Sequence, residues 1–214
     1  MSSGKIVELR QVLAERFPRE IPPPASLLTT GIECLDRSLE GGMRRGTITQ
    51  LVAPYPSCGS ASLLHDLIDS MHTSASQFVA LIDGKNSFEP LGNTDLLLWI
   101  RCENANQAVR ATDLIIRDGN IILSILDLKQ NEVQELRKVP LTAWYRLQRV
   151  AADSGTTLLL ITSHYISGSC FAAVQINNPL RINDLAELSY TVSQTRLLDF
   201  IYRKNYAELG YAQA

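Results

Sequence analysis

The residues whose types and spacing are most suggestive of chemistry form the stretch APYPSCGSAS, residues 53–62. It follows the apolar run GTITQLV and precedes LLHDLI, so we expect a strand, a loop and a helix in succession. Phosphate-binding loops occupy such a connection: glycines admit the phosphates, a lysine neutralises their charge, and a hydroxyl holds Mg²⁺. The position therefore suits nucleotide chemistry, and the residue types decide whether that chemistry is available.

The consensus G-x-x-x-x-G-K-[ST] fails in both plausible alignments of this stretch. If Ala53 stands at the first glycine, Gly59 stands at the lysine and Ser60 at the hydroxyl. If Gly59 is instead the second glycine, Ser60 stands at the lysine and Ala61 at the hydroxyl. Each lost charge-assisted contact is worth roughly 1.5–3 kcal/mol, so a triphosphate should bind about two to four orders of magnitude more weakly.

No Lys or Arg occurs between Arg45 and Lys85, so we expect no neighbouring cation to replace the missing lysine. The start of the helix would still attract an anion weakly. We interpret the loop as a structural turn and expect no catalytic residue, no bound cofactor and no metal ligand in it. The positions of this degenerate loop are Ala53, Pro54, Ser57, Cys58, Gly59 and Ser60.

The elements that would position the loop alternate along the chain. Expected strands cover 46–53, 77–83, 95–101, 120–127 and 156–163. Expected helices cover 31–40, 60–71 and 104–119, with one more inside 139–155. The strands are apolar on both faces and separated by helices, which predicts an α/β fold with a mostly parallel sheet flanked by helices.

The two ends of the chain differ from this middle. Residues 5–17 predict an amphipathic helix, and the proline-rich stretch after it predicts a stiff linker. We therefore divide the chain into residues 1–28, the N-terminal helix and linker, and residues 29–214, the core. Near the C-terminus, two apolar runs flank a short polar step and predict a β-hairpin at about residues 186–204.

The composition excludes some broad classes of function. The chain has 214 residues, with 20 Lys and Arg against 22 Asp and Glu, a net charge of -2. Binding to DNA is possible through a local patch but is not supported by the net charge. The longest apolar runs are too short to span a bilayer, so no membrane partner is expected. Four scattered cysteines argue against zinc and fit a cytoplasmic location.

Several stretches together resemble the core of bacterial RecA. They are the entry segment TTGIECLDRSLEGGMRRGTITQLVAP, the strand and turn FVALIDGKNSFEP, the Walker B-like strand NIILSILD and the strand TTLLLITSH. Their order and spacing agree over roughly residues 29–165. The resemblance implies a RecA-like fold of the P-loop NTPase type.

The departures from that pattern fall on catalytic positions. Lys85 stands where the resemblance implies a catalytic glutamate, and lysine is a poor general base at neutral pH. Gly92 stands at the adenine-stacking aromatic, and Ser163-His164 stands at the phosphate-sensing Asn-Gln pair. Asp127 remains as a residual Walker B-like carboxylate. The expectation is that the protein is not an enzyme.

The chain is also similar to the RecA-like proteins called ImuA and to their smaller relatives, SulA. The segments VLAERFP, QAVRATDLIIRDGNIILSILDL and LLDFIYRKN carry this similarity. It implies a non-catalytic accessory role in the bacterial SOS response, with translesion mutagenesis as one such role, through a protein partner. One alternative is a SulA-like inhibitor of cell division. Another is an NTPase or recombination protein completed in trans by a partner. Self-association is possible in each case.

A set of basic residues follows the Walker B-like strand. It comprises Lys129, Arg137, Lys138, Arg146 and Arg149. The last four are the candidate surface for a protein partner or nucleic acid. Acidic residues are interleaved with them, so we favour a solvated helix face over a DNA-binding surface.

Overall fold

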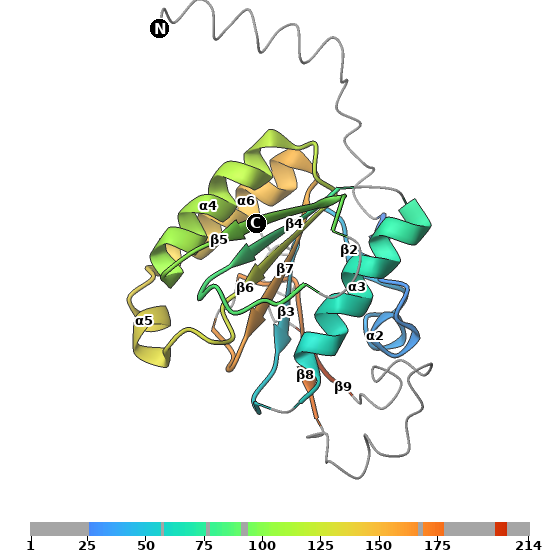
Figure 1. Cartoon of the computed structure of the whole chain (residues 1–214), viewed down its shortest axis with the longest axis horizontal. Coiled ribbons are helices and arrows are strands. Elements are labelled where there is room, and N and C mark those ends of the chain that lie inside the picture. Colours follow the sequence, from blue (N-terminus) through green and yellow to red (C-terminus); the bar gives the residue numbers. More distant parts are fainter. Residues whose placement is uncertain are drawn as a thin grey trace, which may run out of the picture.

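A seven-stranded sheet forms the centre of the molecule, and helices cover both of its faces (Figure 1). The computed structural model describes residues 26–56, 58–75, 78–90, 94–166, 169–177 and 200–204. The strand order is β5-β4-β6-β7-β3-β8-β9. The strands are β3 (Ile48–Val52), β4 (Val79–Asp83), β5 (Leu97–Arg101), β6 (Leu123–Asp127), β7 (Thr157–Thr162), β8 (Ala172–Ile176) and β9 (Phe200–Lys204).

Neighbouring strands from β5 to β8 are parallel, and only β9 runs antiparallel to its neighbour. Every residue of β3, β4 and β7 is buried. Continuous burial of this kind is typical of a parallel sheet whose two faces are both covered, because neither face meets water. The predicted α/β class, a mostly parallel sheet flanked by helices, is confirmed.

The helices form two layers. Helices α2 (Glu33–Ser38) and α3 (Ser60–Ala75) pack on one face of the sheet, and α4 (Ala105–Asp118) and α6 (Leu141–Ser154) pack on the other (Figure 1). The short helix α5 (Val133–Arg137) joins the second layer through its buried Leu136. Each layer shares a separate apolar core with the sheet.

Local signals set the helix ends as expected. The Asn104 side chain accepts a hydrogen bond of 2.9 Å from the Gln107 N–H and caps α4. Gly119 and Gly155 follow α4 and α6 with φ of 71° and 74°, the left-handed conformation that ends many helices. Both helices end within the ranges expected from the sequence, 104–119 and 139–155.

Four elements were not expected from the sequence. They are the antiparallel pair β1 (Leu27–Leu28) and β2 (Met43–Arg44), helix α5, and strand β8. Strands of two residues are too short to show alternation. Their close contact depends on Gly42, because a Cβ there would lie 2.5 Å from the Leu28 carbonyl oxygen.

The ends of the chain fall mainly outside the described residues. The expected helix at 5–17, the linker and the first hairpin strand at 186–193 all lie outside them. Strand β9 pairs antiparallel with β8 at the sheet edge. The domain division and the hairpin therefore stay predictions. Within the described part of the chain, no helix combines the length and apolarity needed to cross a membrane.

Candidate functional site

The loop between β3 and α3 lies at the carboxyl edge of the parallel strands, where ligands bind in open α/β sheets. The Ala53 N–H donates to the Thr162 carbonyl at 2.8 Å, which ties the loop to the end of β7. Gly59 has φ of 80°, and its carbonyl accepts from the Leu63 N–H at 3.0 Å as α3 begins. Ser57 lies outside the described residues.

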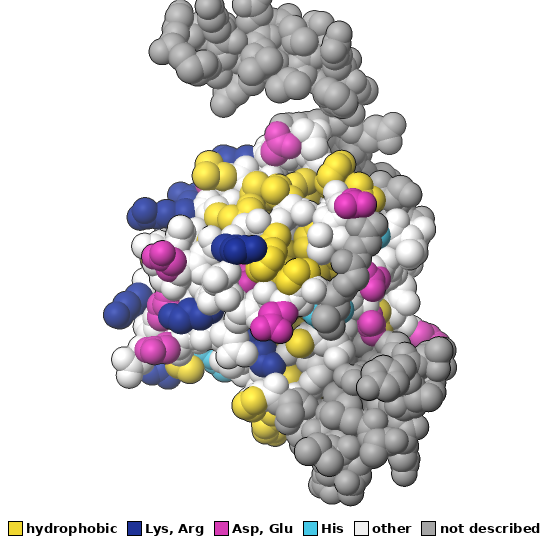
Figure 2. All heavy atoms as spheres, in the orientation of Figure 1, with side chains coloured by type: hydrophobic (Ala, Val, Ile, Leu, Met, Phe, Trp, Pro, Cys, Tyr) yellow, Lys and Arg dark blue, Asp and Glu magenta, His cyan; other side chains and the backbone are white. Residues whose placement is uncertain are grey.

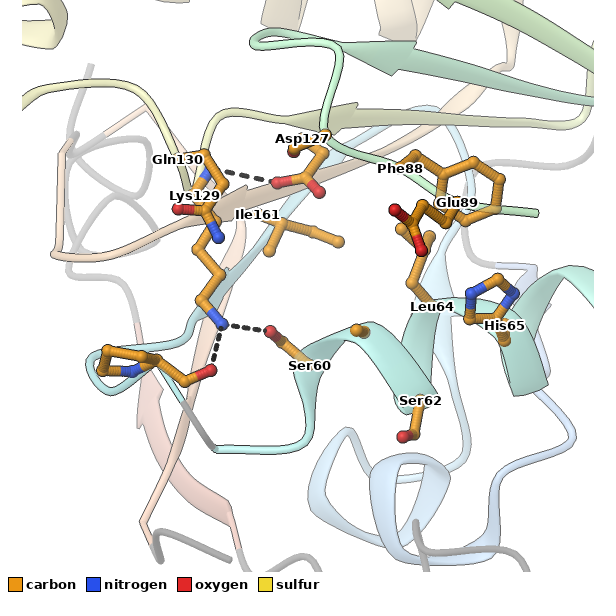
Figure 3. Close-up of a pocket in the computed structure, with 13 residues that line it drawn as sticks. Ser60, Ser62, Leu64, His65, Phe88, Glu89, Asp127, Lys129, Gln130 and Ile161 are labelled. Carbon is orange, nitrogen blue, oxygen red and sulfur yellow. Dashed lines mark hydrogen bonds between the residues drawn. The ribbon is translucent and has the colours of Figure 1, made fainter. Parts of the chain in front are cut away.

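A cavity of about 340 Å³ opens beside this loop (Figure 3). The start of α3, the end of β6 and the segment after β4 surround it. Among its polar lining residues are Ser60, His65, Glu89, Asp127 and Lys129. The cavity therefore brings together one loop hydroxyl, two carboxylates, an imidazole and an ammonium.

Lys129 fills the loop side of this cavity. Its Nζ donates to the Ser60 Oγ at 2.6 Å and to the Pro56 carbonyl at 3.3 Å (Figure 3). It also lies 3.7 Å from the Cys58 Sγ. The sequence around the loop offers no cation, as expected, but the fold brings Lys129 to the loop from elsewhere in the chain. The cation comes from the end of β6, 69 positions further along the chain than Ser60. Lys129 therefore lies in the cavity and not on a basic helix face with Arg137, Lys138, Arg146 and Arg149.

Asp127 and Asp83 end neighbouring strands and stand opposite each other in the register of β4 and β6. The Lys129 N–H donates to the Asp127 Oδ1 at 2.9 Å. Burial raises the pKa of Asp127 to about 6; the nearby Asp83 carboxylate also raises it, while the Lys129 N–H and charge lower it. The residual Walker B-like carboxylate therefore lies in the cavity with a weakened preference for its charged form.

Asp83 serves the turn after β4 and is 1% exposed. Its two carboxylate oxygens accept the backbone N–H groups of Lys85 at 3.2 Å, Ser87 at 3.0 Å and Phe88 at 2.8 Å. A carboxylate so engaged fixes the path of the chain towards Glu89, which lines the cavity. Asp83 acts as an anchor for this turn.

Lys85, at the position of the implied catalytic glutamate, is not among the residues that line the cavity. Its Nζ lies 3.9 Å from the Glu135 Oε2 on α5. Burial raises the pKa of Glu135, but hydrogen bonds from the Ala105 N–H and the Asn131 amide and the charges of Lys85 and Lys138 lower it overall. The Lys85 side chain thus lies on the side of the turn that faces α5.

Glu89 and His65, which also line the cavity, were not among the site residues expected from the sequence. Glu89 precedes Pro90 in the stretch FVALIDGKNSFEP and lines the cavity. Asp83, at the end of the strand in this stretch, was the sequence signal that could have pointed to it. His65 stacks on Phe88 with ring centroids 4.9 Å apart, and burial lowers its pKa. Neither Ser163 nor His164 lines the cavity, and Gly92 lies outside the described residues.

The four candidate surface residues are all exposed on α5, just after it, or on α6. The Nε of Arg146 lies 3.2 Å from the Asp113 carboxylate, which Arg117 also approaches to 3.0 Å. Figure 2 shows acidic side chains interspersed among the basic ones on the side that carries α4 and α5. The mixed charge agrees with a solvated helix surface. The described residues include no cluster of three or more potential metal ligands.

Comparison with known proteins adds two kinds of match. The model of a family of unknown function (DUF7125) matches residues 27–77. Protein RecA of Mycolicibacterium gilvum is 29% identical over 119 residues, which cover 52% of this chain and 33% of that protein. Protein RecA of Kineococcus radiotolerans is 29% identical over 119 residues, 52% of this chain and 34% of that protein. Protein RecA of Nocardia farcinica is 30% identical over 119 residues, which cover 52% of this chain and 34% of that protein.

The chain thus spans about a third of the length of the curated relatives that it matches. The partial similarity and the mostly parallel sheet with helices on both faces together support a RecA-like core. The cavity lies at the carboxyl edge of that core, beside the loop between its first large strand and helix.

Proposed function

We propose that this chain is a RecA-like accessory protein of DNA recombination or repair that acts by binding a protein partner and does not hydrolyse ATP. The observation that carries the proposal is the contact between Lys129 and Ser60. Ser60 stands at the hydroxyl position of the loop in one alignment, and that hydroxyl would hold Mg²⁺. An ammonium group already bonded to it opposes a second cation in the same place.

The ligands of a magnesium nucleotide therefore fit this site poorly. Lys129 donates to the loop at Ser60 and Pro56, so its charge is directed at loop oxygens rather than left free for phosphates. The position of the implied catalytic base holds Lys85, which Glu135 keeps beside α5. The contacts of Lys129 with the loop and the presence of Lys85 at the implied base position both support a RecA-like core that keeps its fold but does not hydrolyse ATP.

The finer part of the proposal rests on resemblance. Similarity to RecA proteins over half of the chain supports a place in recombination or repair. Similarity to ImuA-like proteins supports an SOS-regulated accessory role beside a translesion polymerase. Deleting the gene should then lower damage-induced mutagenesis several-fold while leaving spontaneous mutagenesis unchanged. Equal damage-induced mutagenesis in the deletion strain would argue against this role.

Titration calorimetry with ATP and Mg²⁺ tests the central claim. We expect no binding at micromolar concentrations and no phosphate release from the wild-type chain. Lys129→Ala removes the charge that opposes Mg²⁺, so any change in nucleotide binding should be a gain, and it should release no phosphate because it adds no base. Lys138→Ala, at an exposed lysine just after α5, is the control. Micromolar binding, or turnover that disappears in Asp127→Asn, would refute the proposal.

A second candidate function is an NTPase, completed in trans by a partner. The cavity of about 340 Å³ beside the loop favours it, and in this function Lys129 would have to leave Ser60 and turn to the phosphates. This function predicts measurable nucleotide binding that Lys129→Ala weakens by tenfold or more, and hydrolysis only in the assembled complex. The same titration therefore separates the two candidates.

A further inference from the structure

Helix α6 carries two large apolar side chains on the face that points away from the sheet. Leu141 is 63% exposed and Tyr145 is 57% exposed. They stand four positions apart, so their side chains are neighbours on the surface of the helix. The opposite face packs into the core through Trp144, Leu147, Val150 and Ala151. The two exposed side chains therefore form one apolar patch that the described part of the chain leaves largely uncovered.

The charges around this patch have one sign. From Arg137 to Arg149 the sequence contains four cations and no carboxylate. All four side chains are exposed, and they are Arg137, Lys138, Arg146 and Arg149. Arg149 follows Tyr145 by four positions and continues the exposed stripe by one turn. The patch is thus apolar at its centre and basic before and after it along the chain.

The carboxylates near this stretch leave positive charge in excess. Asp113 on α4 lies 3.2 Å from the Nε of Arg146 and 3.0 Å from the Nε of Arg117, so it is shared between two arginines. Asp153 is exposed in the last turn of α6, one turn beyond Arg149. Arg149 forms no ion pair with any other residue that the structure describes. Its charge is available to a partner.

We propose that this face of α6 is the docking surface for an acidic segment of a protein partner that presents apolar side chains. The inference rests on the proposed function, in which the chain acts by binding a partner, and it names the chemistry of that partner. Apolar side chains of the segment cover Leu141 and Tyr145, and its carboxylates face Lys138 and Arg149. Tyrosine and arginine are among the residue types that most often dominate the binding energy of protein interfaces.

Two other occupants fit this surface less well. A second copy of the chain would set the same patch against itself across a two-fold axis, so its cations would meet like charges. DNA would attract the cations, but its phosphates offer nothing to the exposed Leu141 side chain. An acidic segment with apolar side chains matches both the charge and the apolar centre of the patch.

Fluorescence anisotropy with a labelled synthetic peptide tests the surface on the full chain. The probe is a helical peptide of Glu and Ala with two Leu four positions apart. One control peptide has Ala in place of both Leu, and another has Gln in place of every Glu. We expect the probe to bind with a dissociation constant below about 100 μM and each control peptide to bind at least about tenfold more weakly. No binding of the probe, or equal binding of the three peptides, would overturn the proposal.

Substitutions on α6 locate the binding. Tyr145→Ala and Arg149→Ala should each weaken binding of the probe at least about fivefold. Leu114→Ala and Arg110→Ala are the matched controls, because both residues are exposed on α4, and they should stay within about twofold of the wild type. Circular dichroism of each variant checks that the fold is kept.

Two outcomes of this comparison would count against the docking surface. One is wild-type affinity in both α6 variants. The other is a single-stranded oligonucleotide that binds more tightly than the probe and is weakened by the same variants, which would make the face a nucleic-acid surface. Either result is independent of the titration with ATP and Mg²⁺, so failure of this surface and failure of the proposed function are distinguishable.

Discussion

The Nζ of Lys129 lies 2.6 Å from the Oγ of Ser60, although the two residues are 69 positions apart in the chain. Lys129 follows the end of β6, and Ser60 begins α3. Strand β7 separates β6 from β3 in the sheet, so the lysine reaches across one strand to the loop. The contact gives this loop a cation that its own sequence lacks.

Replacing Lys129 by Met should lower the free energy of unfolding by about 1–2 kcal/mol, because the partly buried Ser60 hydroxyl and the Pro56 carbonyl lose a charged donor. Urea denaturation measures the change. Lys138→Met, on an exposed lysine, should stay within about 0.5 kcal/mol of the wild type.

A double-mutant cycle isolates the contact with Ser60. Lys129→Met and Ser60→Ala should show a coupling free energy of about 0.5–2 kcal/mol, since each variant removes one partner of the same hydrogen bond. Additive effects of the two substitutions would mean that the bond contributes nothing measurable to stability.

Asp127→Asn should stabilise the protein at neutral pH. The folded pKa of Asp127 is raised from 3.8 to about 6, so its stabilising contribution is complete below about pH 4 and is lost as the pH rises through 6. The amide keeps an oxygen for the Lys129 N–H and carries no charge to bury. The gain should be on the order of 2–3 kcal/mol at pH 7–8 and vanish near pH 4.

Unfolding of the wild type and Asp127→Asn at several pH values between 4 and 8 gives the test. The difference between the two proteins, rather than either stability alone, isolates this carboxyl group from others that titrate in the same range. A difference that does not change with pH would contradict the raised pKa.

Asp83→Ala should lower the free energy of unfolding by about 2–4 kcal/mol, because three backbone N–H groups of the turn lose their acceptor. Asp83→Asn should cost less, since one oxygen remains. Thermal unfolding of both variants measures the loss, and Asp69→Ala, on the exposed surface of α3, is the control. Equal stability of Asp83→Ala and the control would count against the anchoring role.

Lys85→Glu should not create ATP hydrolysis. The residue faces Glu135 beside α5, so the new carboxylate would lie outside the cavity and next to a like charge. A phosphate-release assay with ATP and Mg²⁺ checks this, with Lys85→Gln as the control for loss of the lysine alone. Turnover in Lys85→Glu but not in Lys85→Gln would show that one substitution restores the missing base.

Much of the fold can be predicted from the chain because its signals are local. Buried strands read as apolar runs, and α4 begins at Asn104 and ends before Gly119. The local sequence does not predict strand β8 or the pair of β1 and β2. These strands are short, and pairing with neighbouring strands stabilises them more than their own residue pattern does.

The same distinction between local signals and tertiary contacts applies to the candidate site. That the loop contains no lysine, and that Lys85 stands where the RecA resemblance implies a glutamate, can be read directly, because both concern residue type at a known spacing. That Lys129 enters the loop, that Lys85 turns to Glu135 and that Glu89 lines the cavity depend on the order of the strands. Parallel strands bring their carboxyl ends together across long stretches of chain, and no local pattern records which side chains meet there.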